Sequence, residues 1–303
     1  MQDSTTWLVS TDGRINEHNI YIENNQIVND CELTVTSSLA FTLSACGYDV
    51  WLPNYRGTGY SNGHVLYDSI YDTKYWEFTF TELALYDVRA VVEYILRKTL
   101  QSSVGYIGHS LGSTTMFILL SLMPEFERYV KPFIAFAPFV FMSNMRSNLR
   151  IVENFESNLR NIPRAVGIPE SIRQLIGTRL PIYVSHTGST FSTWIYAHVS
   201  QLIRTGRFAL FDYGIQQNKE RYGRSVPPDY PLNHILSKNI ALFYGLNDLV
   251  ANITDVLTLI NRLNVKLLDN YLVAHPKWTH HDFNVGVHQG QYVNKRVLKL
   301  LKP

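Results

Sequence analysis

The feature that most constrains the fold of this chain is the motif G-H-S-L-G at residues 108–112, which lies between two apolar segments. Residues 103–107 have the composition of a short buried strand, and residues 111–122 predict an apolar helix. A serine between two glycines at a strand-to-helix turn is typical of a nucleophile elbow, in which a strained backbone presents the hydroxyl above the sheet edge. Both glycines are needed there, because side chains at those positions would collide with the neighbouring strand and helix.

Strand and helix patterns alternate around this motif. Strands are predicted at 48–52, 132–137, 240–244 and 265–273, and helices at 38–46, 82–100, 254–263 and 289–301. Such alternation predicts an α/β fold with a mostly parallel sheet and helices on both faces, as in the α/β hydrolases. The first 30 residues are polar and aperiodic, so the N-terminal strands of such a sheet are expected to be missing or divergent.

One region interrupts the alternation. In residues 139–190, arginines and apolar residues mix without a strand pattern, which indicates an inserted helical cap. We therefore expect a hydrolase core formed by residues 32–138 and 206–303, a cap or lid at 139–205, and a divergent segment at 1–31.

Composition excludes several function classes. A net charge of +2, with Lys and Arg spread along the chain, gives no reason to expect a nucleic-acid partner. Neither H-E-x-x-H nor a close Cys/His set occurs, so no metal or other cofactor is expected. The opening residues predict no signal peptide, and no stretch predicts a transmembrane segment.

Two local features bear on processing. Cysteines occur only at Cys31 and Cys46, too few for a disulfide framework, and Cys46 is expected to be a buried free thiol. The sequence Asn252-Ile253-Thr254 is a glycosylation acceptor if the protein enters the secretory pathway.

A serine nucleophile needs a histidine to take its proton and a carboxylate to orient that histidine. In this fold they follow in the chain order serine, acid, histidine. The favoured acid is Asp248, just beyond the predicted strand at 240–244, whereas the rival Asp255 falls inside the next helix, where a solvated position is expected.

The histidine is sought after the last predicted strand. There His280 is the first choice as general base and the adjacent His281 is the alternative. The backbone N–H of Leu111 is the expected oxyanion-hole donor. The remaining candidates, His186, His198, His275 and His288, are expected to be structural or solvated.

At this point the sequence resembles the acid lipase family, which includes gastric and lysosomal acid lipases and insect relatives. The resemblance is carried by S-L-A-F at 38–41, G-Y-D-V-W-L at 47–52, N-Y-R-G at 54–57, Y-W-E-F at 75–78, Y-D at 86–87, G-H-S-L-G-S-T-T at 108–115 and H-H-D-F at 280–283. Residues 183–186, 206–208 and 211–214 also resemble the end of that family's cap.

The resemblance implies a lipase that hydrolyses triacylglycerols or cholesteryl esters in a lysosomal or secreted location. It assigns the nucleophile to Ser110, the acid to Asp248 and the base to His280. The cap suggests a lid that meets a lipid–water interface, and a solvated cap over a small-ester pocket is the alternative. Peptide or epoxide hydrolysis would suit the same scaffold.

The chain also departs from the family. Relatives carry a His-Gly segment whose following backbone N–H completes the oxyanion hole, and no such segment is recognisable before Cys31. Losing one such donor typically costs about 2.7–4 kcal/mol of transition-state stabilisation. The alternative hypothesis is therefore a catalytically impaired hydrolase-fold protein that binds lipid or a partner.

Overall fold

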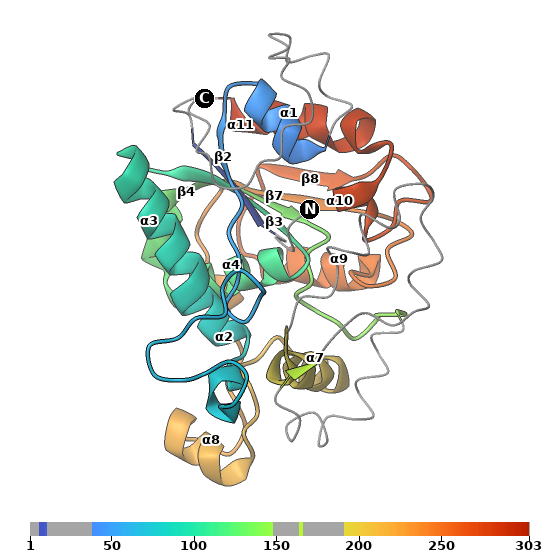
Figure 1. The fold of residues 1–303 in the computed structure, drawn as a ribbon. Coiled ribbons are helices and arrows are strands. Elements are labelled where there is room, and N and C mark those ends of the chain that lie inside the picture. Colours follow the sequence, from blue (N-terminus) through green and yellow to red (C-terminus); the bar gives the residue numbers. More distant parts are fainter. Residues whose placement is uncertain (1–5, 11–37, 148–163, 166–190, 303) are drawn as a thin grey trace.

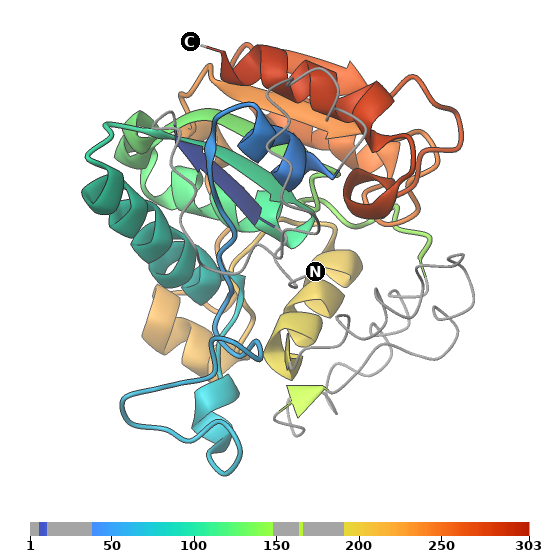
Figure 2. The ribbon, with the colours of Figure 1, turned by 45° about the horizontal axis from the view of Figure 1, so that its top comes forward.

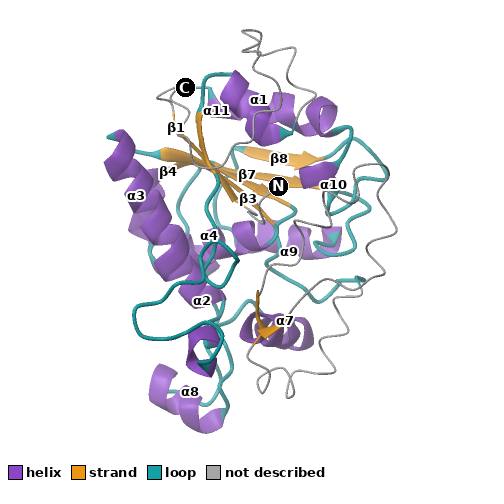
Figure 3. Ribbon diagram, in the orientation of Figure 1, coloured by secondary structure: helices purple, strands orange, loops and turns teal. Residues whose placement is uncertain are grey.

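The centre of the molecule is a six-stranded sheet with the strand order β2-β1-β3-β4-β7-β8 (Figures 1 and 3). The computed structural model describes residues 6–10, 38–147, 164–165 and 191–302. Strands β3, β4, β7 and β8 are parallel, and β1 pairs antiparallel with both β2 and β3. The strand bounds are β1 Thr6–Ser10, β2 Asp49–Trp51, β3 Val104–His109, β4 Val130–Phe136, β7 Ile240–Tyr244 and β8 Asp269–Leu272.

Helices cover both faces of the sheet. Side chains point alternately to the two faces along each buried strand, so both faces are apolar and both are packed against helices. Tyr106 and Leu242 belong to a hydrophobic cluster shared with α3, α4 and α9, whereas Ile107 and Phe243 belong to a second cluster shared with α1 and α11. These helices are α1 Leu39–Ala45, α3 Arg89–Thr99, α4 Leu111–Leu122, α9 Ile253–Arg262 and α11 Lys295–Leu301. The predicted α/β architecture with a largely parallel sheet is therefore confirmed.

Shorter helical elements complete the described part. The helix predicted at 82–100 consists of α2 Phe80–Glu82, a π-helical turn Leu83–Val88 and α3 in direct succession. A second π-helical turn, Gly290–Asn294, leads into α11. Helix α10 is Asp282–Val285, while α7 Thr193–Thr205 and α8 Ile215–Tyr222 lie away from the sheet (Figure 2).

The structure adds a strand where the sequence predicts none. Strand β1 occupies Thr6–Ser10 and pairs with both neighbours, so the N-terminal segment does contribute to the sheet. Five residues are too few for a period-2 pattern to stand out from a polar surrounding. The rest of the predicted divergent segment, residues 1–5 and 11–31, lies outside the described residues.

The predicted cap is described only in part, and residues 148–163 and 166–190 lie outside the described ranges. Residues 139–142 are buried and join the core cluster shared with α3 and α4. Strand β6 Phe191–Ser192 pairs with β5 Arg164–Ala165, and Ser192 Oγ donates to the carbonyl of Trp76. The boundaries at 139 and 205 remain a prediction.

Cys46 corrects one expectation. It follows the last residue of α1, is only half-buried and is disulfide-bonded, so the prediction of a buried free thiol is wrong. The segment is apolar on average, but the helix ends at Ala45 and leaves Cys46 at the edge of the core. Average hydropathy does not reveal that change of environment.

Candidate active site

The candidate nucleophile lies at a strained turn. Ser110 has φ 53° and ψ −114°, between the end of β3 at His109 and the start of α4 at Leu111. A Cβ on Gly108 would lie 2.6 Å from the backbone carbon of Gly112, so only glycine lets strand and helix approach this closely. The Ser110 N–H donates to the carbonyl of Phe136 at 3.0 Å, which ties the turn to β4.

Asp248 lies in the loop that follows β7 and is almost fully buried. Its Oδ1 accepts hydrogen bonds from the backbone N–H groups of Val250 and Ala251, each at 2.8 Å. Its Oδ2 lies 2.9 Å from Nδ1 of His280. Both oxygens of the carboxylate therefore accept hydrogen bonds, Oδ1 from its own loop and Oδ2 from the imidazole.

His280 lies in the loop between β8 and α10 and is 6% exposed. The carboxylate of Asp248 can only accept, so Nδ1 of His280 donates this hydrogen bond and Nε2 is the ring nitrogen that Asp248 does not engage. Gly245 allows the two loops to meet, because a Cβ there would lie 2.5 Å from the carbonyl oxygen of Trp278.

The strand register brings these loops to one edge of the sheet. Gly108 pairs with Ala135 on β4, which in turn pairs with Leu242 on β7, so the carboxyl ends of these parallel strands are aligned. The ring of His109, the residue before Ser110, lies with its centroid 4.7 Å from that of His280. In the described residues no direct hydrogen bond joins Ser110 to His280, a contact that often tightens only with substrate bound.

Leu111 occupies the first position of α4. The first N–H groups of a helix have no intrahelical acceptor, so this N–H is available beside Ser110. No His-Gly segment that would supply a second oxyanion donor is recognisable before Cys31, and of residues 1–31 only 6–10 lie in the described ranges.

The rival acid, Asp255, proves to be buried and not solvated as predicted. Its two oxygens accept from the backbone N–H of Asn144 at 2.9 Å and from the Asn144 side-chain amide at 2.8 Å. The first turn of α9 therefore holds the chain segment after β4. A helical pattern indicates which face a residue occupies, but it does not reveal a loop folded over that face.

The alternative histidines occupy other positions. His281 is exposed, and its ring packs edge-on against that of His280. His275 packs edge-on against Trp278 and Tyr292 and stacks with His288. His186 lies outside the described residues.

His198 is a buried histidine of α7 that should make stability depend on pH. Its Nε2 lies 2.9 Å from the carbonyl of Ala209, its ring stacks on Phe80, and burial lowers its pKa to about 4. The unfolded chain, with a pKa near 6.5, binds the proton more tightly, so stability is lost as pH falls from about 6.5 towards about 4. When the pH falls from 7 to 4.5, His198 should lower the free energy of unfolding by about 2–3 kcal/mol, which urea unfolding can measure.

His198→Gln, which keeps a donor for the Ala209 carbonyl, should flatten that part of the pH dependence. The matched control is His234→Gln, because His234 is exposed and should leave the slope as in the wild type. Equal slopes in all three proteins would contradict the assignment.

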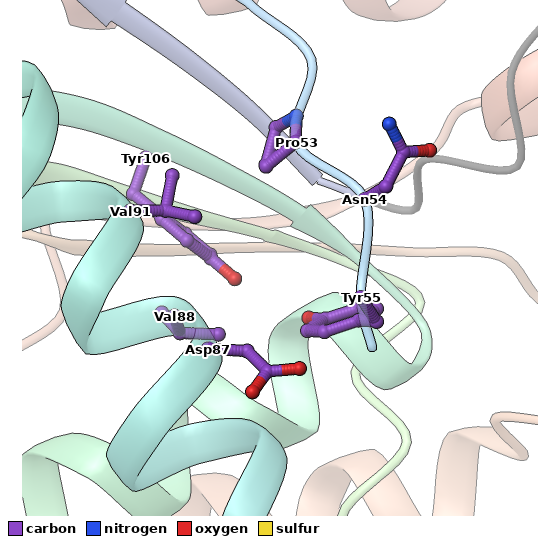
Figure 4. A pocket seen from close by; sticks show the side chains of 7 residues that line it. All are labelled: Pro53, Asn54, Tyr55, Asp87, Val88, Val91 and Tyr106. Atoms are coloured by element: carbon purple, nitrogen blue, oxygen red, sulfur yellow. The ribbon is translucent and has the colours of Figure 1, made fainter. Parts of the chain in front are cut away.

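Two further features of the described residues lie apart from the triad candidates. A small pocket is lined by Pro53, Asn54, Tyr55, Asp87, Val88, Val91 and Tyr106 (Figure 4). Asp87 lies on the π-helical turn and pairs with Arg56 at 2.5 Å, so this pocket borders a structural ion pair. Asn252, in the predicted glycosylation sequon, uses Oδ1 to cap α9 through the N–H of Thr254 at 3.0 Å.

Within the described ranges, no helix combines the length and apolar character needed to cross a bilayer. The same residues contain no cluster of three or more His, Cys, Asp or Glu side chains arranged to hold a metal ion.

Comparison with known proteins first defines the class. Residues 31–164 match the model of the alpha/beta hydrolase fold. A soluble variant of monoglyceride lipase from Saccharomyces cerevisiae superposes with a TM-score of 0.53 at 12% identity, covering 89% of this chain and 83% of that one. The fold is therefore that of the α/β hydrolases.

Sequence relatives then define the family. Lipase 3 of Drosophila melanogaster is 30% identical over 88% of this chain and 76% of its own length. Gastric triacylglycerol lipase of Rattus norvegicus is 29% identical, and lysosomal acid lipase/cholesteryl ester hydrolase of Macaca fascicularis is 27% identical, each over 88% of this chain and 74% of the relative. The chain belongs to the acid lipase family.

Proposed function

We propose that this protein is a serine ester hydrolase, a lipase that cleaves acyl esters of neutral lipids. The observation that carries the proposal is the 2.9 Å hydrogen bond between Asp248 and His280, at the sheet edge where Ser110 occupies its positive-φ turn. The proposal is supported by the carboxyl ends of β3 and β7 lying at one edge of the sheet, because the loops that carry Ser110 and Asp248 follow those two ends.

The proposed chemistry assigns each group one task. His280 Nε2 takes the proton of Ser110 Oγ as that oxygen attacks the ester carbonyl, and Asp248 stabilises the resulting imidazolium. The N–H of Leu111 donates to the oxyanion. The tetrahedral intermediate expels the alcohol, which takes the proton from His280. Water then attacks the acyl-enzyme while His280 takes a proton from it. The bond between the acyl carbon and Ser110 Oγ breaks, Oγ regains the proton from His280, and the fatty acid leaves.

The substrate class rests on the relatives, which are named for triacylglycerol and cholesteryl ester hydrolysis. We extend both substrates to this chain as neutral-lipid esters, with the cap meeting the lipid–water interface. A lysosomal or secreted location accords with the disulfide at Cys46, because disulfides persist in oxidising compartments.

The test is turnover by the purified chain on emulsified trioleoylglycerol and cholesteryl oleate at pH 5 and pH 7. We expect many moles of fatty acid per mole of protein on both lipids. On tributyrin, a triacylglycerol that dissolves at low concentration, the rate should rise when the substrate passes from monomers to an emulsion. A rate that does not rise at that transition would favour a small-ester pocket under a solvated cap.

Failure to exceed one turnover on both lipids and on short p-nitrophenyl esters would overturn the proposal. Binding of the same lipids without turnover would then identify a hydrolase-fold lipid-binding protein.

A further inference from the structure

His109 connects the two halves of the candidate site. It ends β3 immediately before Ser110, is 3% exposed, and its Nε2 lies 2.9 Å from the backbone carbonyl oxygen of His280. A carbonyl oxygen can only accept, so Nε2 of His109 carries the hydrogen and donates it. The nucleophile's neighbour in the chain thus holds the main chain of the candidate base.

A second hydrogen bond holds the other nitrogen of the His109 ring. Its Nδ1 lies 2.9 Å from Nδ2 of Asn284, on α10. With the hydrogen on Nε2, Nδ1 is an acceptor, so the Asn284 amide donates to it. The donor chain runs from Asn284 to His109 and on to the His280 carbonyl, and it spans β3, the loop after β8 and α10.

The charge of His109 suits this position. Burial lowers the pKa of His109 well below its ordinary value, and the nearby rings of His280 and His281 lower it further. The hydrogen bond to the His280 carbonyl raises the pKa but does not offset these effects. A protonated ring at this distance from His280 would disfavour the imidazolium that forms during the reaction. A neutral amide at position 284 leaves His109 neutral, whereas a carboxylate facing Nδ1 would attract a second proton.

We propose that His109 and Asn284 are positioning residues, which hold the His280 main chain so that its imidazole keeps Nδ1 on Asp248 and Nε2 towards Ser110. The inference rests on the proposed function. Neither side chain needs to touch the substrate, because both act through the backbone of His280. Small displacements of a catalytic group cost rate more than binding.

The experiment compares kcat and KM for p-nitrophenyl butyrate in three variants. His109→Leu removes the donor to the His280 carbonyl and should lower kcat by about 10- to 100-fold with little change in KM. His109→Gln can still donate through its amide, so it should recover most of kcat. His234→Gln, a His-to-Gln change at an exposed position outside the candidate site, is the matched control and should behave as the wild type.

Asn284→Leu keeps the inference testable if His109→Leu does not fold. It should lower kcat in the same direction but less, and adding His109→Leu to it should cost less than in the wild type, because the two side chains act as one unit. Thermal unfolding of each variant separates loss of fold from loss of positioning.

Three results would overturn the inference. These are an unchanged kcat in either leucine variant, an equal loss in His109→Leu and His109→Gln, or a loss confined to KM. A wild type that neither turns over nor is labelled by a fluorophosphonate would instead refute the proposed function. An active wild type matched by its folded leucine variants would refute only the positioning role.

Discussion

Ser110→Ala is expected to reduce ester hydrolysis to near background and to abolish labelling by a fluorophosphonate probe. Only the hydroxyl is removed, and the close approach of Gly108 and Gly112, on either side of residue 110, does not involve its side chain. Removing a serine nucleophile typically lowers kcat by about a million-fold. Initial rates on p-nitrophenyl butyrate and covalent labelling followed by mass spectrometry would measure both effects.

Ser102→Ala makes the same chemical change at an exposed position just before β3 and serves as the matched control. It should retain wild-type rates and labelling. Wild-type hydrolysis by Ser110→Ala would remove this hydroxyl from the mechanism, whatever its backbone geometry.

Asp248→Asn is expected to lower kcat by about 10,000-fold while the protein stays folded. The reason lies in how the carboxylate is used. Its Oδ1 accepts from the N–H groups of Val250 and Ala251, so an asparagine must place its oxygen there and turn its NH₂ group towards His280. Nδ1 of His280 would then have to accept, which moves the ring proton to Nε2 and leaves no base for Ser110.

Asp255→Asn distinguishes the expected role of Asp255 from that of Asp248. Its bonds to Asn144 hold the segment after β4, so this variant should unfold at lower urea concentration but keep kcat within a few-fold of wild type. The opposite pattern, with kcat lost in Asp255→Asn and kept in Asp248→Asn, would show that the acid is assigned to the wrong residue.

Much of the fold could be predicted from periodicity and turn chemistry. Helix α4 and strand β7 have the predicted bounds, Leu111–Leu122 and Ile240–Tyr244, because each is mainly apolar and is closed by a clear stop. Strand β1 and helix α10 were not predicted, because each is a short segment in polar surroundings whose partners on the sheet and at the site are distant in sequence.

Some residues of the candidate site could likewise be predicted from the sequence, and others could not. A motif with a mechanism identified Ser110, and position after a predicted strand suggested Asp248. The Asn284–His109–His280 chain had no such signal, because it depends on one side chain reaching a backbone carbonyl 171 residues away. The burial of Asp255 was missed for the same reason, since its partner Asn144 approaches from another part of the chain.

Strands β4 and β7 are hydrogen-bonded neighbours although the long segment 137–239 separates them in the chain. The spacing between the Ser110 turn and the Asp248 loop is therefore fixed by β-sheet register and does not depend on the length of that intervening segment. Insertions or deletions between residues 137 and 239 are therefore expected to leave the position of the Ser110 turn relative to the Asp248 loop unchanged.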